Sequence, residues 1–272
     1  MALNFHLSDV YDKNVSFLLG SGASFGLFPT LALGVKDQDG RAMTVETLAT
    51  SLADGRENPQ YTALFMHYYK QCIEPVLTMD YESVRHDAVK AAVLENYTKF
   101  LRTILFMLGR KKSGDKKVCN VFTTNYDGCL AFAAEELLRH GANEFHMNDG
   151  AQGFKRRFLN ARNFNTTLTQ TGVFGRHRND VPQVNLIQLH GSTYWYKDEQ
   201  RIQVNYSQGN DARLVTNAGF ARCANFSAAL QDANGTVADL PYVAFEGEEV
   251  SDFWSRYDAL PIVNPTKWKF HE

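Results

Sequence analysis

The chain has few cysteines, no C-x-x-C pair and no long apolar run. Its four cysteines are widely spaced, at Cys72, Cys119, Cys129 and Cys223. We therefore expect free, inert thiols in a reducing cytoplasm, and no metal site built from them. The most apolar stretch, around residues 104–108, is far too short to span a bilayer. The start of the chain lacks a basic segment followed by an apolar core, so we expect no signal peptide and a cytoplasmic protein.

Several motifs of known chemistry are also absent. The sequence contains no G-x-S-x-G of serine hydrolases, no paired histidine motif of metal hydrolases and no Gly-Lys-Ser/Thr of a Walker loop. The formal net charge is only -2 and charged residues make up 21%, so nothing in the balance indicates nucleic acid or an anionic membrane as a partner. With 272 residues, of which 44% are hydrophobic, the chain can bury a substantial core in one large α/β domain or in two small ones.

What is present is a set of three apolar, strand-like runs, each followed by a short polar string. The runs cover residues 15–19, 118–122 and 185–189. The strings are Gly20–Ser24, Thr123–Asp127 and His190–Ser192. In an open α/β sheet, ligands bind beyond the carboxyl ends of the strands. The three strings therefore predict one shared site, of a size that suits a dinucleotide.

The first string is a glycine-rich turn between a strand and a helix. Such a turn lets backbone amides approach a diphosphate, and a helix N-terminus favours its negative charge. Gly20 and Gly22 supply the turn, while Ser21 and Ser24 add hydroxyl donors. The dehydrogenase fingerprint needs a third glycine at a position that Phe25 occupies, so that class is excluded.

The other two strings carry an amide, a carboxylate and an imidazole. Asn125 and Asp127 are one residue apart, so in extended backbone they point the same way. Asn can bind ribose hydroxyls or a water, and Asp can stabilise a cationic sugar. Alternatively, the string is only a turn held by Asx-type hydrogen bonds. A histidine in the position of His190 suits general-base work, although a lone histidine is more often structural.

Between these strings the sequence predicts further elements. Helices are expected at 44–53, at 61–74 ending before Pro75, at 85–108 and at 130–138, with a hairpin of 194–196 with 201–204 and a short strand at 260–265. Residues 142–183 are irregular and hold a basic cluster of Lys155, Arg156, Arg157, Arg162, Arg176 and Arg178. That cluster faces substrate phosphates or a partner protein, or is simply a solvated insertion.

The three strings, in this order, resemble the hallmarks of the sirtuin (silent information regulator) family: a G-A-G-x-S loop, a T-x-N-x-D string and an H-G dipeptide. The longer strings Phe122–Asp127 and Leu189–Tyr196 are similar to bacterial sirtuin-like proteins of anti-phage defence, including those paired with a HerA-type ATPase. The resemblance implies an α/β fold: a Rossmann-like sheet of mainly parallel strands flanked by helices, with helical and loop insertions.

The same resemblance implies an activity and a set of site residues. The activity is hydrolysis of NAD+ to nicotinamide and ADP-ribose, which depletes NAD in an infected cell. The implied catalytic residues are Asn125, His190 and Asp127. The implied residues that bind NAD+ as substrate are Gly20, Ser21, Gly22, Ala23, Ser24, Thr123, Thr124, Asn125, Asp127, Gly191 and Ser192.

Three departures from the family pattern qualify the resemblance. The two C-x-x-C pairs of the zinc module of deacetylating sirtuins are absent, so no zinc is expected. The Asp-Phe-Arg string after the first loop is unmatched at Leu27–Thr30. No later G-x-S or G-F-G-F loop closes the adenosine side, which indicates a C-terminally truncated module without the last strands of its sheet. We therefore predict one sirtuin-like domain over 1–272, with a helical insertion at about 40–112, an irregular basic insertion at about 142–183 and an irregular segment at about 205–258.

Two further functions stay open beside NAD+ hydrolysis. The chain is either a regulatory or scaffold subunit that binds NAD or ADP-ribose with little activity alone, or an NAD-dependent protein deacylase. The mid-chain insertions and the aromatic run at Tyr194–Tyr196 favour a homo-oligomer, and the resemblance implies the same, because members of that family commonly form oligomers. A HerA-type ATPase is the partner that the resemblance implies, and no membrane or nucleic-acid partner is expected.

Overall fold

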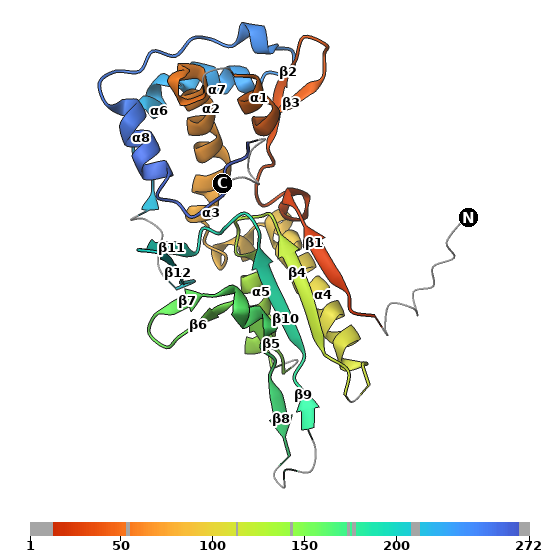
Figure 1. Cartoon of the computed structure of the whole chain (residues 1–272). Coiled ribbons are helices and arrows are strands. Elements are labelled where there is room, and N and C mark those ends of the chain that lie inside the picture. Colours follow the sequence, from red (N-terminus) through yellow and green to blue (C-terminus); the bar gives the residue numbers. More distant parts are fainter. Residues whose placement is uncertain are drawn as a thin grey trace, which may run out of the picture. The chain divides into compact units, whose positions relative to one another are not determined.

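The computed structural model of the chain is shown in Figure 1 and describes residues 13–52, 55–112, 114–141, 144–172, 175, 178–207 and 213–266. The chain divides into two compact units, one of residues 1–27 with 80–206 and one of residues 28–79 with 207–272. All three strings of the predicted site fall in the first unit. The expected helical insertion at 40–112 is divided between the units, and the prediction of a single domain stays a prediction.

Four parallel strands form the main sheet of the first unit (Figure 1). In sheet order these are β1 (Ser16–Leu19), β4 (Val118–Thr123), β10 (Gln183–Gln188) and β5 (His146–Asn148). The three strands predicted from apolar runs are therefore present and adjacent. With the helices that flank the sheet, they confirm the predicted fold class, a Rossmann-like α/β fold.

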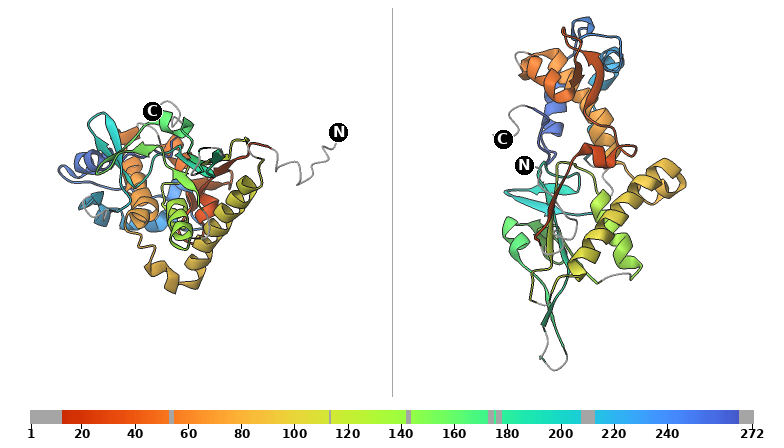
Figure 2. Two further views of the ribbon diagram at one scale, coloured as in Figure 1. Left: turned by 90° about the horizontal axis from the view of Figure 1, so that it is seen from below. Right: turned by 90° about the vertical axis from the view of Figure 1, so that its right-hand side faces the viewer.

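Two helices, α4 (Ala88–Gly109) and α5 (Cys129–Arg139), lie side by side in the first unit (Figure 2). Asp87 caps α4 by accepting hydrogen bonds from the backbone amides of Val89 and Lys90, which fixes the start of the helix. The predicted helix at 85–108 is confirmed, but Ser83–His86 forms a separate 3₁₀ turn before the cap. The buried stripe of α4 follows three- and four-residue spacing: Leu94, Tyr97, Leu101, Ile104, Leu105 and Leu108.

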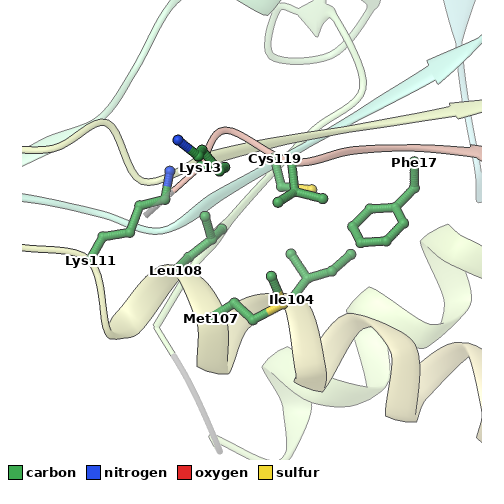
Figure 3. Close-up of a pocket in the computed structure, with 8 residues that line it drawn as sticks. Lys13, Phe17, Ile104, Met107, Leu108, Lys111 and Cys119 are labelled. Carbon is green, nitrogen blue, oxygen red and sulfur yellow. The ribbon is translucent and has the colours of Figure 1, made fainter. Parts of the chain in front are cut away.

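One face of β1 and β4 packs against α4. The rings of Phe17 on β1 and Phe100 on α4 meet edge to face with their centroids 5.0 Å apart. In Figure 3, the side chains of Phe17 and Cys119 come from the strands and face Ile104 and Leu108, which come from α4. Burial alternates along β4, so Cys119 and Val121 lie in the core.

The segment 142–183 was expected to be irregular, and this expectation is wrong. Besides β5 it contains β6 (Ala151–Gln152), β7 (Arg157–Leu159), a 3₁₀ turn (Ala161–Asn165), β8 (Thr169–Thr171) and β9 (Arg178–Asp180). Amide side chains of β10 hold it to the main sheet, since Asn185 Nδ2 donates to Phe164 O at 3.2 Å and Gln183 Nε2 donates to Thr166 O at 2.9 Å. These strands are too short to leave a periodic pattern in the sequence.

A second, antiparallel sheet in the first unit has the order β11-β12-β7-β6. Its hairpin of β11 (Trp195–Asp198) and β12 (Arg201–Val204) confirms the predicted hairpin. Strand β12 also pairs with β7, with Val204 opposite Arg157. The turn His190–Ser192 therefore joins the main sheet to the second one.

The second unit is mainly helical and has an aromatic core. It contains β2 (Ala32–Lys36), β3 (Ala42–Thr44), α1 (Val45–Ser51), 3₁₀ turns Gly55–Glu57 and Val237–Asp239, α2 (Pro59–Tyr68), a π-helix (Tyr69–Ile73), α3 (Glu74–Leu77), α6 (Gly219–Arg222), α7 (Ala224–Leu230) and α8 (Glu249–Tyr257). Phe65, Tyr68, Tyr69, Phe226, Phe253 and Tyr257 are its largest fully buried side chains. The buried indole N–H of Trp254 has a hydrogen-bond acceptor, because Nε1 donates to Thr62 Oγ1 at 3.1 Å.

Several expectations for the second unit are corrected. The helix expected to end before Pro75 continues past it, because the chain widens into a π-helix just before the proline. A proline lacks an amide proton and clashes with the preceding turn of an α-helix, and the wider turn accommodates it. The helix expected at 44–53 is present as α1 over Val45–Ser51, and residue 53 lies outside the described residues. Residues expected to be irregular at 205–258 hold α6, α7 and α8. No strand covers 260–265, where only an isolated bridge at Ile262 occurs.

None of the helices in the described ranges is both long and apolar enough to cross a membrane. The predicted loss of the last strands of the sheet stays a prediction, as does the cytoplasmic location.

Candidate functional site

The three strands that carry the predicted site end at the same level of the main sheet. Thr123 at the end of β4 is in register with Leu19 of β1 on one side and with Gln188 of β10 on the other. The pairing runs one step further, since Thr124 N donates to Leu19 O at 3.1 Å and Leu189 N donates to Thr123 O at 2.8 Å. The glycine loop, the Asn/Asp string and the His-Gly dipeptide therefore leave one edge together, as the sequence predicts.

The hydroxyl of Ser24 is the point at which two of these strings meet. Ser24 is 3% exposed. Its Oγ donates to Asp127 Oδ2 at 2.7 Å and accepts from Asn125 Nδ2 at 3.1 Å. Tyr97 Oη lies 2.7 Å from the same oxygen. Because a serine has one proton to donate, and Asp127 takes it, the Tyr97 hydroxyl is the donor in that contact.

Both carboxylate oxygens of Asp127 accept a hydrogen bond in this arrangement. Its Oδ2 accepts from Ser24, and its Oδ1 accepts the backbone amide of Cys129 at 3.0 Å. Cys129 is the first residue of α5, so the carboxylate lies at the helix N-terminus, where negative charge is favoured. The Asx-type turn weighed in the sequence is therefore present, and it also holds the carboxylate next to Asn125.

Thr123 and Thr124 set the turn that presents Asn125. The Oγ1 of the buried Thr123 accepts the Asn125 backbone amide at 3.0 Å. The backbone amide of Thr124 donates to the carbonyl of Leu19. Asn125 is 8% exposed, so it lies at the floor of this edge of the sheet.

The His190 string is fastened to the Asn/Asp string. Thr193 donates twice to the Tyr126 carbonyl, from its backbone amide at 3.1 Å and from its Oγ1 at 3.0 Å. Gly191 has a φ of 82°, a left-handed conformation that favours glycine. Ser192 is fully buried, and its Oγ accepts the Tyr194 amide at 3.2 Å. Ser192 therefore shapes the turn, while the half-buried His190 stands directly beyond β10.

The glycines around the site fall into two kinds. A Cβ on Gly22 would have nothing within 4 Å, and one on Gly20 would meet only Thr124 Oγ1 at 3.8 Å. Neither has a positive φ, so the fold itself does not require glycine at either position. In contrast, a Cβ on Gly128 would lie 2.6 Å from the Tyr194 ring. Gly20 and Gly22 leave open space in front of exposed backbone, which is what close approach of a ligand needs.

The helix expected after the glycine loop is only one 3₁₀ turn, Ser21–Ser24, so that expectation is wrong. Phe25 is extended and Gly26 has a φ of 92°, a combination that ends the turn at once. Any anion at this loop would therefore meet backbone amides and hydroxyls without the dipole of a long helix. Ser21, Gly22 and Ala23 are exposed there.

The sequence did not identify the tyrosines of the site. Burial, and after it the negative charge of Asp127, raise the pKa of Tyr97, so its phenol stays a donor to Ser24. The hydroxyl of Tyr81 accepts the Gly128 amide at 2.8 Å. Tyr97 follows the three- and four-residue spacing of the buried α4 stripe, so its pattern in the sequence indicates a core residue, and its polar end is the one signal of a further role.

Cysteine and metal chemistry find no support in the described residues. All four cysteines are free. Burial raises the pKa of Cys129, the one nearest the site, well above its ordinary value, so its thiol is not a ready nucleophile. Within the described ranges, no group of three or more His, Cys, Asp or Glu residues is placed to hold a metal.

Comparison of the chain with models of known protein families finds no match, and comparison with curated proteins finds none either. The sirtuin-like resemblance therefore rests on the three strings and stays a prediction.

Proposed function

We propose that the chain is an NAD+ glycohydrolase, which cleaves NAD+ to nicotinamide and ADP-ribose. The observation that carries the proposal is the alignment of three strand ends, with the Ser24 hydroxyl joining Asn125 to Asp127 beside the turn of His190. This arrangement supplies a buried amide, a carboxylate and an imidazole at one edge, the groups that cleavage of an N-glycosidic bond can use.

In the proposed reaction, the bond between C1′ of the ribose and the nicotinamide nitrogen breaks, and its electron pair leaves with nicotinamide. Asn125 binds a ribose hydroxyl or the attacking water. Asp127 holds Ser24 and Asn125 in place and lies beside the cationic sugar. His190 takes the proton of the water whose oxygen bonds to C1′. The products are nicotinamide, ADP-ribose and one proton.

The glycine loop has a separate role in this proposal. The open space in front of Gly20 and Gly22 lets the diphosphate approach the backbone, and Ser21 adds an exposed hydroxyl. Ser24 differs, because its hydroxyl is already used inside the protein. We propose that Ser24 positions Asn125 and Asp127, and that Ser21, Gly22 and Ala23 contact NAD+.

The test is incubation of the purified full chain with NAD+, with nicotinamide and ADP-ribose quantified by chromatography. We expect equal amounts of both products and their loss in Asn125→Ala. Asn234→Ala, an exposed asparagine of the second unit, is the matched control and keeps activity. Absence of release from the intact assembly, with its partner present, contradicts the proposal.

A second function, a subunit that binds NAD or ADP-ribose without turnover, has one observation in its favour. Asn125 is 8% exposed and one of its two amide protons is already bonded to Ser24, so little of its side chain is left to bind a ribose. Calorimetry that shows NAD binding, together with no nicotinamide release, supports this alternative. Nicotinamide release that depends on an acyl-peptide supports NAD-dependent deacylation.

The biological setting that we propose is anti-phage defence by NAD depletion, in a homo-oligomer with a HerA-type ATPase. This part rests on the resemblance of the three strings alone. Co-purification of the chain with its neighbouring gene products, and survival of infected cells that carry Asn125→Ala, test it.

A further inference from the structure

Arg157 of the basic cluster differs from its neighbour Arg156 in the burial of its ion-pair partner. Arg156 forms an exposed ion pair with Asp198, the two side chains being 64% and 37% exposed. Its neighbour Arg157 pairs with Asp149, whose side chain is only 10% exposed. Arg176 and the side chain of Arg178 lie outside the described residues. Among the cluster members whose side chains the structure describes, Arg157 is therefore the one held by a buried carboxylate.

The guanidinium of Arg157 is fixed by one of its nitrogens. Nη2 donates to Asp149 Oδ1 at 2.6 Å and to the Ala151 carbonyl at 3.2 Å, which uses both of its protons. Asp149 Oδ1 also accepts the Ala151 amide at 3.1 Å. Within the described part of the chain, Nε and Nη1 of Arg157 donate no hydrogen bond, and the side chain is 37% exposed. The guanidinium of Arg157 is therefore held in one orientation by Asp149 and Ala151, and its Nε and Nη1 donors are directed away from these two residues.

A series of contacts leads from the proposed site to this arginine. The Tyr194 ring packs on Gly128, which follows Asp127. Tyr206 lies next along the series, with its ring centroid 5.0 Å from that of Tyr194. Burial and the charge of Asp149 raise the pKa of Tyr206, so the Asp149 carboxylate is close to its hydroxyl. Two packed tyrosines therefore lie between the Asp127 turn and the Asp149–Arg157 pair.

The strand register gives the same placement. Arg157 on β7 is opposite Val204 of β12, and Val204 is opposite Trp195 of β11. The turn that begins at His190 leads directly into β11. Arg157 therefore belongs to the sheet that continues from the candidate catalytic turn.

We propose that Arg157 binds a phosphate group of a nucleotide ligand and that Asp149 is its positioning residue. The proposal rests on the proposed function, in which the phosphate belongs to NAD+ or to a second phosphate-bearing ligand bound beside it. A planar guanidinium with free donors matches phosphate oxygens, and a partner that fixes its orientation lowers the ordering cost of binding.

The test is calorimetric binding of ADP-ribose to the full chain and to its variants. Arg157→Gln alone leaves Asp149 buried without its partner, which is destabilising, so the main variant is the double change Asp149→Asn with Arg157→Gln. Two amides there keep a hydrogen bond and remove the charge. Circular dichroism and urea unfolding check that it folds. Arg156→Gln is the matched control, and Arg157→Lys keeps a cation without the planar fork.

We expect the double variant to bind ADP-ribose at least about tenfold more weakly, in line with the loss of a charge-assisted hydrogen bond. Arg156→Gln stays within about twofold of the wild type, and Arg157→Lys falls between them. Equal affinity of the double variant and the wild type for both ADP-ribose and pyrophosphate overturns the proposal. The proposal is also overturned if the wild type binds neither ADP-ribose nor inorganic pyrophosphate.

Pyrophosphate distinguishes the two sources of the phosphate. Competition between pyrophosphate and ADP-ribose assigns Arg157 to the dinucleotide, whereas pyrophosphate binding to the ADP-ribose complex, lost in the double variant, assigns it to a second ligand. Neither readout needs turnover. The proposal therefore stands if nicotinamide release is absent but binding depends on Arg157, and the proposed function stands if release occurs and binding ignores Arg157.

Discussion

The Oγ of Ser24 donates a hydrogen bond of 2.7 Å to Oδ2 of Asp127, 103 residues away in the chain. This bond joins the loop after β1 to the loop after β4. The same hydroxyl also accepts from Asn125 and contacts Tyr97. One buried serine therefore sets the geometry of the amide and the carboxylate on which the proposed chemistry depends.

Replacement of Ser24 by Ala should destabilise the first unit. The change removes a donor from Asp127 and an acceptor from Asn125 and Tyr97, and it leaves buried polar groups without partners. We expect a loss of about 2 kcal/mol in the free energy of unfolding, measured by urea denaturation of the full chain. Ser21→Ala, on the exposed part of the same loop, should change it by less than about 0.5 kcal/mol. A loss in Ser21→Ala as large as in Ser24→Ala contradicts this account.

Gly22 and Gly128 should respond to alanine in opposite ways. A Cβ on Gly22 meets nothing in the protein, whereas one on Gly128 lies 2.6 Å from the Tyr194 ring. We expect Gly22→Ala to keep its stability but to lose at least about tenfold in ADP-ribose affinity, because the methyl group occupies the space left for a ligand. Gly128→Ala should lose about 1–3 kcal/mol of stability. Calorimetry and urea unfolding measure the two effects, and a Gly22→Ala protein that binds ADP-ribose normally is the contrary result.

His67 in the second unit should make stability depend on pH. It is 3% exposed, and burial lowers its pKa from 6.5 to about 4. Between these two values the unfolded chain binds more protons than the folded one, so stability falls as pH falls from about 6.5 to 4 and is fully present above 6.5. The expected contribution is about 3 kcal/mol over that window.

The measurement for His67 is urea unfolding of the wild type and of His67→Gln at pH 7 and pH 4.5. The variant should show a smaller drop between the two pH values. His86→Gln, on an exposed histidine, should show the same drop as the wild type. Identical pH dependence in the wild type and in His67→Gln contradicts the assignment.

The sequence predicted those parts of the fold that have a strong local pattern. Phe17, Val121 and Leu186 lie in apolar runs long enough to predict the strands of the main sheet, and the stripe of α4 repeats over many turns. In contrast, Asn148 and Arg157 lie on strands of three residues. Asn148 is held by an amide contact with Asn185 and Arg157 by an ion pair with Asp149, and no local pattern in the sequence reveals such contacts.

The site was predicted in part for the same reason. The strings that end the strands could be placed at one edge because parallel strands share a direction. The partners that complete the site, Tyr97 on α4 and Tyr194 after the His-Gly turn, come together only through packing. The expected helix after the glycine loop was wrong, because the extended Phe25 and the positive φ of Gly26 end it after one turn.

The most direct test of the central claim is the rate of nicotinamide release from NAD+ by the wild type, His190→Ala and His86→Ala in one assay. His86, an exposed histidine on the 3₁₀ turn before α4, controls for the loss of an imidazole elsewhere in the first unit. The account predicts release by the wild type and by His86→Ala at similar rates, and none above background by His190→Ala. Release by His190→Ala at the wild-type rate would contradict it.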